Sequence, residues 1–232
     1  MSNTSKGKGE KGSKFWIDTC VESPELKAVI DEIIGDTLEW KSPLSADNYV
    51  EFELKQCNAL LGLDKNEIKE KFSFWPNRGK SPQWDGIALG SNGRTLFLFE
   101  AKSYPGEVKS GRTSATGNNK RIIEEAMRSV HDKYYPNGDF SLWTDKYYQI
   151  GNRLTFLHKI QELKLDKFDC IKLVFLNFVN DKTNKRATSL EQWKDYMDKV
   201  FACITGYNDL PKDVLDIFVD VSEYSYLYET RT

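Results

Sequence analysis

Cysteine, histidine and long apolar runs are scarce in this sequence. Its 232 residues include four cysteines and two histidines. The cysteines lie far apart and form no CxxC pair, which argues against a disulfide framework or a zinc knot and favours reduced thiols. No run approaches the ~18 apolar residues of a membrane span, and no charged and then apolar leader opens the chain. We therefore expect a cytoplasmic protein without a membrane partner.

An excess of charge of one sign is also missing. Lysine and arginine number 33, aspartate and glutamate number 35, and the formal net charge is -2. This balance gives no global attraction to nucleic acid or anionic lipid, so a site for a polyanion must be a local patch. Residues 1–14 are rich in Ser, Gly and Lys, and we expect a flexible polar tail there. The hydrophobic share of 39% suffices for one substantial core, which predicts a single domain over 15–232.

Hydrophobic periodicity predicts an α/β protein. Helical patterns with capping residues cover 23–40, 45–63, 120–135, 144–163 and 189–206. Short apolar runs between Pro, Gly and Asn predict a three-stranded meander over 71–76, 83–89 and 95–103, with further strands over 168–179 and 214–222. This order of elements favours a mixed central sheet flanked by helices.

The strand expected over 95–103 ends in charged residues. Because side chains alternate along a strand, Glu100 and Lys102 share one face, about 6.5–7 Å apart, with the Ala101 carbonyl between them. If the preceding strand pairs antiparallel through the turn at 90–94, Asp85 lies near Glu100. Two carboxylates at such a distance repel one another unless a cation lies between them. A buried strand that ends in this way therefore predicts a metal site.

The predicted ligands indicate which metal and which chemistry. Two carboxylates and a carbonyl are hard oxygen ligands, which suit Mg²⁺ or Mn²⁺ better than zinc. Such an ion polarises a phosphodiester oxygen and lowers the pKa of a bound water, while Lys102 can orient that water or offset charge at phosphorus. The pattern favours a metal-dependent phosphodiester hydrolase. The structural alternative is an ordinary surface strand with a Glu-Lys pair.

These motifs resemble a known family. Asp85 followed by Glu100-Ala101-Lys102 in paired strands, with a helix before and helix and strand after, resembles the PD-(D/E)xK nuclease superfamily, the restriction-endonuclease-like fold. The resemblance implies an αβββαβ core, metal ligation by Asp85, Glu100 and the Ala101 carbonyl, and a catalytic role for Lys102. In the family a proline directly precedes the aspartate, whereas here Gln83 and Trp84 separate Pro82 from Asp85.

A glutamate in the segment FELKQCNALLGL is a second point of similarity. The segment resembles the helix opening of Mrr-type and Holliday-junction-resolvase-like members, in which the helix glutamate approaches the metal. The matching position here is Glu53. On a helix, Glu53 shares the inward face with Val50 and Cys57, and Glu51 does not. We therefore expect Glu53, and not Glu51, near the metal.

Contacts to nucleic acid are expected from six polar and basic residues, which are Lys109, Arg112, Lys120, Arg121, Gln149 and Arg153. The first four lie in and after the polar loop that follows the Lys102 strand. The last two share a helix face away from its apolar stripe, one turn apart. All six could contact phosphates. A solvated loop and an ordinary pair on a helix surface are the alternatives.

The sequence thus leads to one functional hypothesis and two alternatives. We expect a Mg²⁺- or Mn²⁺-dependent nuclease that acts on DNA rather than RNA, as an endonuclease of a restriction, repair or defence type. Two cuts in a duplex would call for a homodimer. The main alternative is a catalytically silent nuclease-fold subunit that binds nucleic acid or a partner protein. The other is hydrolysis of a different phosphate ester.

Overall fold

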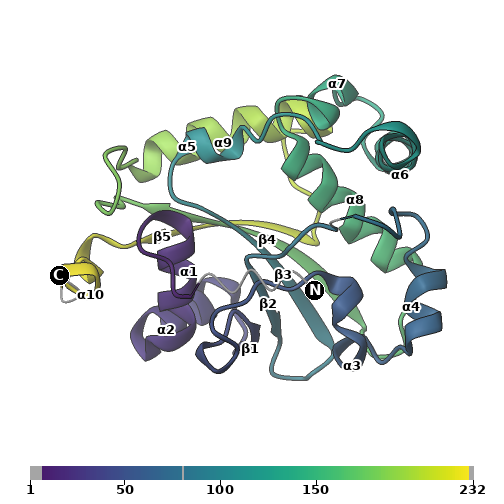
Figure 1. The fold of residues 1–232 in the computed structure, drawn as a ribbon. Coiled ribbons are helices and arrows are strands. Elements are labelled where there is room, and N and C mark those ends of the chain that lie inside the picture. Colours follow the sequence, from purple (N-terminus) through teal and green to yellow (C-terminus); the bar gives the residue numbers. More distant parts are fainter. Residues whose placement is uncertain (1–6, 80, 230–232) are drawn as a thin grey trace.

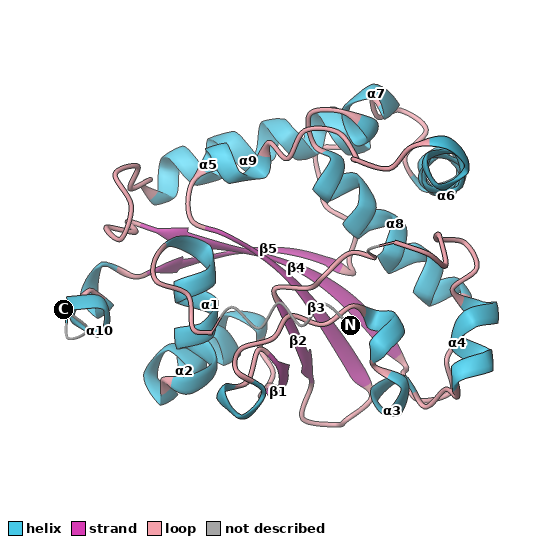
Figure 2. Cartoon of the chain, viewed as in Figure 1, coloured by secondary structure: helices cyan, strands magenta, loops and turns pink. Residues whose placement is uncertain are grey.

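The computed structural model describes residues 7–79 and 81–229, and its centre is a five-stranded sheet (Figures 1 and 2). The strands are β1 (Glu39–Ser42), β2 (Gly86–Leu89), β3 (Thr95–Lys102), β4 (Cys170–Val179) and β5 (Val214–Asp220). They lie in the order β1-β2-β3-β4-β5. The first three pair antiparallel, and β3, β4 and β5 pair parallel. The predicted α/β class with an open mixed sheet between helices is confirmed.

Helices cover both faces of the sheet (Figure 2). On one face lie α1 (Gly12–Glu22) and α2 (Pro24–Ile34). On the other lie α6 (Gly117–Tyr134), α8 (Tyr148–Glu162) and α9 (Leu190–Thr205). The shorter helices are α3 (Asn58–Leu61), α4 (Lys65–Lys71), α5 (Pro105–Val108), α7 (Phe140–Thr144) and α10 (Tyr226–Glu229). The described chain also has three 3-10 turns, which are η1 (Ser45–Asp47), η2 (Leu54–Gln56) and η3 (Ser222–Tyr224).

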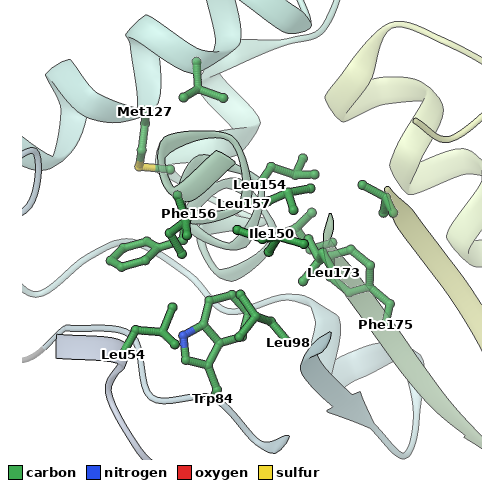
Figure 3. Packing of buried hydrophobic residues seen from close by; sticks show 14 of the residues in the cluster. Leu54, Trp84, Leu98, Met127, Ile150, Leu154, Phe156, Leu157, Leu173 and Phe175 are labelled. Atoms are coloured by element: carbon green, nitrogen blue, oxygen red, sulfur yellow. The ribbon is translucent and has the colours of Figure 1, made fainter. Parts of the chain in front are cut away.

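Strand β3 contributes alternate side chains to two hydrophobic clusters. Leu96 and Leu98 belong to the cluster under α6, α8 and α9, while Phe97, Phe99 and Ala101 belong to the cluster under α1 and α2. Figure 3 shows Leu98 in the first of these clusters, near α8 residues. Continuing this alternation, Glu100 and Lys102 lie on the α8 side of the sheet. The buried strand therefore carries its two charges toward α8.

Two local predictions rest on capping and turn residues, and both are confirmed. Ser189 accepts a hydrogen bond from the backbone N–H of Gln192 at the start of α9, and Gly206 ends the helix with a φ of 74°. A positive φ of this kind costs glycine little, which is why it commonly ends helices. In the β2–β3 hairpin, Leu89 pairs with Leu96, as expected for strands joined through the turn at 90–94.

The expected helix over 45–63 is wrong, because the chain there is interrupted. Asn48 and Tyr49 have φ values of 55° and 56°, which an α-helix does not accommodate. The segment instead forms η1, η2 and the short α3, with irregular chain between them. The predicted strand over 71–76 is also absent from the sheet, because Phe72 ends α4 and Trp75 turns back into the core beside it.

The first strand of the sheet comes from a different part of the chain. Helix α2 ends at Gly35, which has a φ of 74°, and Glu39 and Trp40 then pair with Leu89 and Ala88. Both residues had been expected in the helix over 23–40. The apolar periodicity continues past Gly35, but the glycine ends the helix, and the buried Trp40 packs against Phe99 with ring centroids 4.6 Å apart.

The predicted polar tail over 1–14 is partly ordered. Helix α1 begins at Gly12, and the Lys14 ammonium bonds the buried carboxylate of Asp18 at 2.7 Å. The Gly9 N–H donates to the same carboxylate at 2.8 Å. These bonds fix the segment because burial makes an unpaired carboxylate costly. The start of the predicted tail, 1–6, lies outside the described residues.

Two other expectations can be compared directly with the fold. All four cysteines are free thiols, consistent with the prediction of reduced thiols. Within the ranges 7–79 and 81–229, no helix combines the length and apolar character needed to span a bilayer. The sheet and its two helical layers therefore account for the long apolar segments of the described chain.

The position of Leu98 predicts a large effect on stability. Its side chain is 0% exposed between the sheet and α8, so Leu98→Ala should lower the free energy of unfolding by about 2–5 kcal/mol. Leu190→Ala removes the same atoms from a side chain that is 43% exposed and should cost less than about 1 kcal/mol. Urea unfolding measures both, and equal losses would contradict this packing.

Candidate active site

Asp85 directly precedes β2 and lies beside the end of β3. Gly86 pairs with Phe99, so Asp85 falls opposite Glu100, as the turn had predicted. The Asp85 Oδ2 atom accepts a hydrogen bond from the Ala101 N–H at 2.7 Å. A Cβ atom at Gly86 would come within 2.7 Å of the Trp40 ring, so glycine permits the close approach of β2. These contacts fix the Asp85 carboxylate against the β3 backbone.

The carboxylate of Glu100 lies between two cations. Its Oε1 atom accepts a hydrogen bond from Lys102 Nζ, and its Oε2 atom accepts one from Arg153 Nε at 2.6 Å. The exposed fractions are 1% for Glu100, 7% for Lys102 and 3% for Arg153. Buried ion pairs offset the cost of removing charges from water only when well-oriented hydrogen bonds satisfy both partners. Glu100 is therefore the electrostatic centre of the site.

Burial and charge act in opposite directions on Glu100 and Lys102. Burial alone would raise the pKa of Glu100, but the charges and hydrogen bonds of Arg153 and Lys102 lower it overall. Burial alone would lower the pKa of Lys102, but the carboxylates of Glu100 and Asp85 raise it. Glu100 is thus an anion and Lys102 an ammonium at neutral pH.

Asp85 has a different environment from Glu100. Burial, followed by the nearby charge of Glu100, raises its pKa from 3.8 to about 7, and the charge of Glu51 acts in the same direction. Lys102 and Arg153 offset only part of this effect. The two carboxylates therefore differ in charge near neutral pH, because the two cations bond Glu100 and not Asp85.

Arg153 belongs to this site and does not lie on an exposed helix face. Its Nη2 donates to the Gln83 carbonyl at 2.6 Å, and its guanidinium lies 4.5 Å from the centre of the Trp84 ring. The sequence had placed Arg153 beside Gln149, away from the apolar stripe. That expectation is wrong for Arg153 because α8 is buried along most of its length, on its polar side as well. Gln149 is half-buried, and its backbone N–H bonds Ser110 Oγ at 2.8 Å.

The helix expected to carry Glu53 does not form, so the assignment of its inward face was wrong. Glu53 immediately precedes η2, where its backbone N–H donates to the Gln56 side chain at 3.4 Å. Glu51, which had been expected to point away, is the residue whose charge affects Asp85. Glu51 also forms an ion pair with Lys14 at 3.4 Å. The left-handed residues Asn48 and Tyr49 break the helical spacing on which the prediction depended.

Three of the four basic residues in and after the polar loop, which were expected to bind phosphate, already pair with carboxylates. Arg112 contacts Asp145 at 2.9 Å, Lys120 contacts Glu124 at 3.6 Å, and Arg121 contacts Glu125 at 2.6 Å. Lys109, the fourth, is exposed. All three ion pairs are solvent-exposed, and such pairs are weak enough to exchange for other partners. The loop after β3 and the first turns of α6, which hold Lys120 and Arg121, therefore present less unpaired positive charge than the sequence suggests.

Sequence reasoning missed a polar residue on β4. Asn177 is the strand partner of Lys102, is fully buried, and donates through Nδ2 to Asp216 Oδ1 at 2.7 Å. Its Oδ1 atom has no hydrogen-bond partner among the described residues. Burial raises the pKa of Asp216 to about 7. The signal in the sequence was a single asparagine inside the apolar run FLNFV.

Asp85 and Glu100 supply hard oxygen atoms of the kind that Mg²⁺ or Mn²⁺ binds, but both oxygens of Glu100 are bonded to Lys102 and Arg153. In the part of the chain that the structure describes, no three His, Cys, Asp or Glu side chains form a group that could hold a metal. A cation here would therefore have only these two carboxylates as acidic ligands. The Ala101 N–H faces Asp85, and because the N–H and C=O of a strand residue point to the same side, its carbonyl does too. A cation there would relieve the repulsion that helps to raise the pKa of Asp85.

The raised pKa of Asp85 predicts how stability depends on pH. As pH rises from about 4 to 7, the unfolded chain loses the Asp85 proton before the folded protein does, so the folded state loses stability. Asparagine cannot ionise and can still accept the Ala101 N–H. Without metal, Asp85→Asn should therefore exceed wild type in stability at pH 8, by up to roughly 4 kcal/mol, and match it near pH 4.

Chemical unfolding of both proteins from pH 4 to 8 in EDTA measures this difference. Asp145→Asn is the matched control, because the hydrogen bond from Arg112 lowers the pKa of that exposed carboxyl. This control should gain no stability at pH 8. An Asp85→Asn protein that is less stable than wild type at pH 8 would contradict the environment described for Asp85.

The structure brings Asp85, Glu100 and Lys102 together at the end of β3 and adds Arg153 from α8. Glu53 lies in the adjoining chain, bridged to Gln83, without a described contact to Glu100. Comparisons with family models, curated proteins and solved structures give no match to this chain. A function is therefore inferred from these residues alone.

Proposed function

We propose that this protein is a metal-dependent phosphodiester hydrolase, a nuclease, with a restriction-endonuclease-like core. The observation that carries the proposal is the convergence of Asp85, Glu100 and Lys102 at one end of a buried strand. The order of the elements supports it: helix α2, three antiparallel strands, a helical crossover and a parallel strand follow one another. Because one fold serves many functions, the charged site carries more of the argument than the sheet does.

The ion would be Mg²⁺ or Mn²⁺, held by Asp85, Glu100 and the Ala101 carbonyl. When bound, such an ion polarises a phosphodiester oxygen and lowers the pKa of a coordinated water. The protein's own residues fix the ligands: the Ala101 N–H holds Asp85, and Arg153 holds Glu100. In the metal-free protein burial and Glu100 raise the pKa of Asp85 to about 7, so near and below neutral pH a cation would have to displace the proton of Asp85.

Lys102 acts as a cation in this proposal and not as a base. Its pKa is raised by Glu100 and Asp85, so it keeps its proton at neutral pH. Within the described residues it donates one hydrogen bond, to Glu100, and an ammonium has three N–H donors. The others can bond a phosphate oxygen or the attacking water and offset the negative charge that grows at phosphorus.

We propose DNA as the substrate, in an endonuclease reaction of a restriction, repair or defence type, with a homodimer where both strands are cut. The second candidate is a silent subunit that binds nucleic acid or protein. One observation favours it: Lys102 and Arg153 already engage both oxygens of Glu100. In such a subunit these cations would replace the metal and serve stability alone.

The first functional prediction concerns metal dependence and Lys102. Plasmid, linear duplex, single-stranded DNA and RNA are incubated with protein in Mg²⁺, in Mn²⁺ and in EDTA. DNA cleavage should need either metal and stop in EDTA. Lys102→Met should lower the rate by about 10²-fold or more, because it removes a charge that stabilises the transition state.

Lys194→Met on the exposed side of α9 is the matched control and should cleave at the wild-type rate. Thermal melting shows whether each variant is folded. Cleavage in EDTA, or an undiminished rate for folded Lys102→Met, would contradict the mechanism. Binding of DNA without cleavage under any condition would favour the silent subunit.

The second functional prediction separates Glu51 from Glu53. In the metal-free protein Glu51 adds to the rise in the pKa of Asp85 that burial and Glu100 cause, so Glu51→Gln should reduce the loss of stability between pH 4 and 8 in EDTA. Glu53→Gln, a matched neutralisation two residues away, should leave this pH dependence in place. Chemical unfolding of both variants measures it, and a change caused by Glu53→Gln alone would overturn this assignment.

A further inference from the structure

A pocket lies at the carboxyl ends of β3 and β4, beside the proposed active site. Tyr104 follows Lys102 by two residues, and the loop over 180–189 follows β4. Together with the start of α1 and the residue before it they line an open pocket of about 320 Å³. In open α/β sheets, ligands bind outside the carboxyl ends of the parallel strands. The cavity therefore lies where this fold places ligands.

Positive charge predominates in this pocket. Lys11, Lys185 and Arg186 line it, and among the described residues none of the three has a carboxylate within ion-pair distance. One acid, Glu107, is also present, but its Oε2 accepts the Ser103 N–H at 2.8 Å, and burial raises its pKa. The pocket differs in this respect from Arg112, in the loop before α6, and from Arg121, in α6, whose charges are paired.

A buried hydrogen-bond network holds the walls of the pocket together. Asp181 is fully buried and accepts hydrogen bonds from Ser103 Oγ and, at 2.9 Å, from Asn184 Nδ2. Thr183 Oγ1 accepts the Gly12 N–H at 2.7 Å. The network thus joins the end of β3, the loop after β4 and the start of α1. It fixes the backbone that carries the cations, which lowers the cost of ordering them around a ligand.

An aromatic ring completes the pocket. The Arg186 guanidinium lies 5.3 Å from the centre of the Tyr104 ring. A Cβ atom at Gly106 would come within 2.4 Å of that ring, so glycine allows the Tyr104 ring to lie close to the backbone of α5. Arginine held over an aromatic face keeps its N–H groups at the guanidinium edge, where they can bond phosphate oxygens.

We propose that this pocket binds a backbone phosphate of the nucleic-acid strand, next to the phosphate at Lys102. The proposal rests on the proposed function, and it names the surface that holds the strand. Two residues of extended chain span at most about 7 Å, so Tyr104 is within reach of the phosphates that neighbour the cleaved one. The contacts are to the backbone and carry no base specificity.

Fluorescence anisotropy of a labelled DNA oligonucleotide tests the pocket in EDTA, where the proposed reaction cannot proceed. The double variant Lys185→Gln/Arg186→Gln removes two exposed cations and should raise Kd about 10-fold or more at low salt. It should also reduce the slope of log Kd against log salt by about 1–2, because fewer counterions are released.

The matched control is Lys65→Gln/Lys69→Gln, which removes the same charge from exposed positions of α4. Its Kd should stay within twofold of wild type. Equal effects of the two double variants on Kd would contradict phosphate binding by this pocket, even if the protein cleaves DNA. Loss of binding confined to Lys185→Gln/Arg186→Gln would support the pocket even if no cleavage is found, so the two proposals fail separately.

Free phosphates distinguish the source of the ligand. Inorganic phosphate and a nucleoside monophosphate are added as competitors, and each should displace the oligonucleotide only at more than 100-fold higher concentration. If a nucleoside monophosphate competes at the same concentration as the oligonucleotide, the proposal that the pocket binds a nucleic-acid strand is wrong. The ligand would then be a free nucleotide.

Discussion

The ion pairs of Glu100 with Lys102 and Arg153 are the interaction on which the rest of the site depends. All three groups lie at the buried end of β3, where an uncompensated charge would be costly. The pairs also join two layers, because Glu100 belongs to the sheet and Arg153 to α8. The position of α8 and the ionisation of the site are therefore set by the same contact.

Trp84 links this contact to the hydrophobic core. Its fully buried ring packs near Phe156 on one side and carries the Arg153 guanidinium on another. Arg153 in turn bonds the carbonyl of Gln83, one residue earlier in the chain. The segment before β2 is thereby held against α8. Asp85, which follows Trp84, is held against β3. A packed core thus sets the distance between the two acidic groups.

The sequence predicted the parts of the site that depend on strand alternation and turn geometry. Glu100 and Lys102 share a face because the period of a strand is two, and Asp85 lies opposite because the turn fixes the register. The position of Glu53 could not be predicted, because two left-handed residues, Asn48 and Tyr49, replace the expected helix.

Arg153 was assigned to an exposed helix face for a different reason. A helical-face argument assumes that the side away from the main apolar stripe meets solvent, but α8 is surrounded by the sheet and by other helices. A polar residue on such a helix must find a partner inside the protein. The asparagine of β4, Asn177, is a similar case, since only the register with Lys102 reveals which charged group lies next to it.

The separation of Glu100 and Arg153 along the chain has a consequence for folding. The chain between these two residues, which includes α6, α7 and the start of α8, must bring its ends together before the ion pair can form. Closing such a long loop costs conformational entropy and slows folding. Until α8 docks, Glu100 remains a hydrated carboxylate at the end of an incomplete sheet. Local hairpin formation between β2 and β3 can bring Asp85 to Ala101 early, but the full charge arrangement exists only once α8 has docked on the sheet.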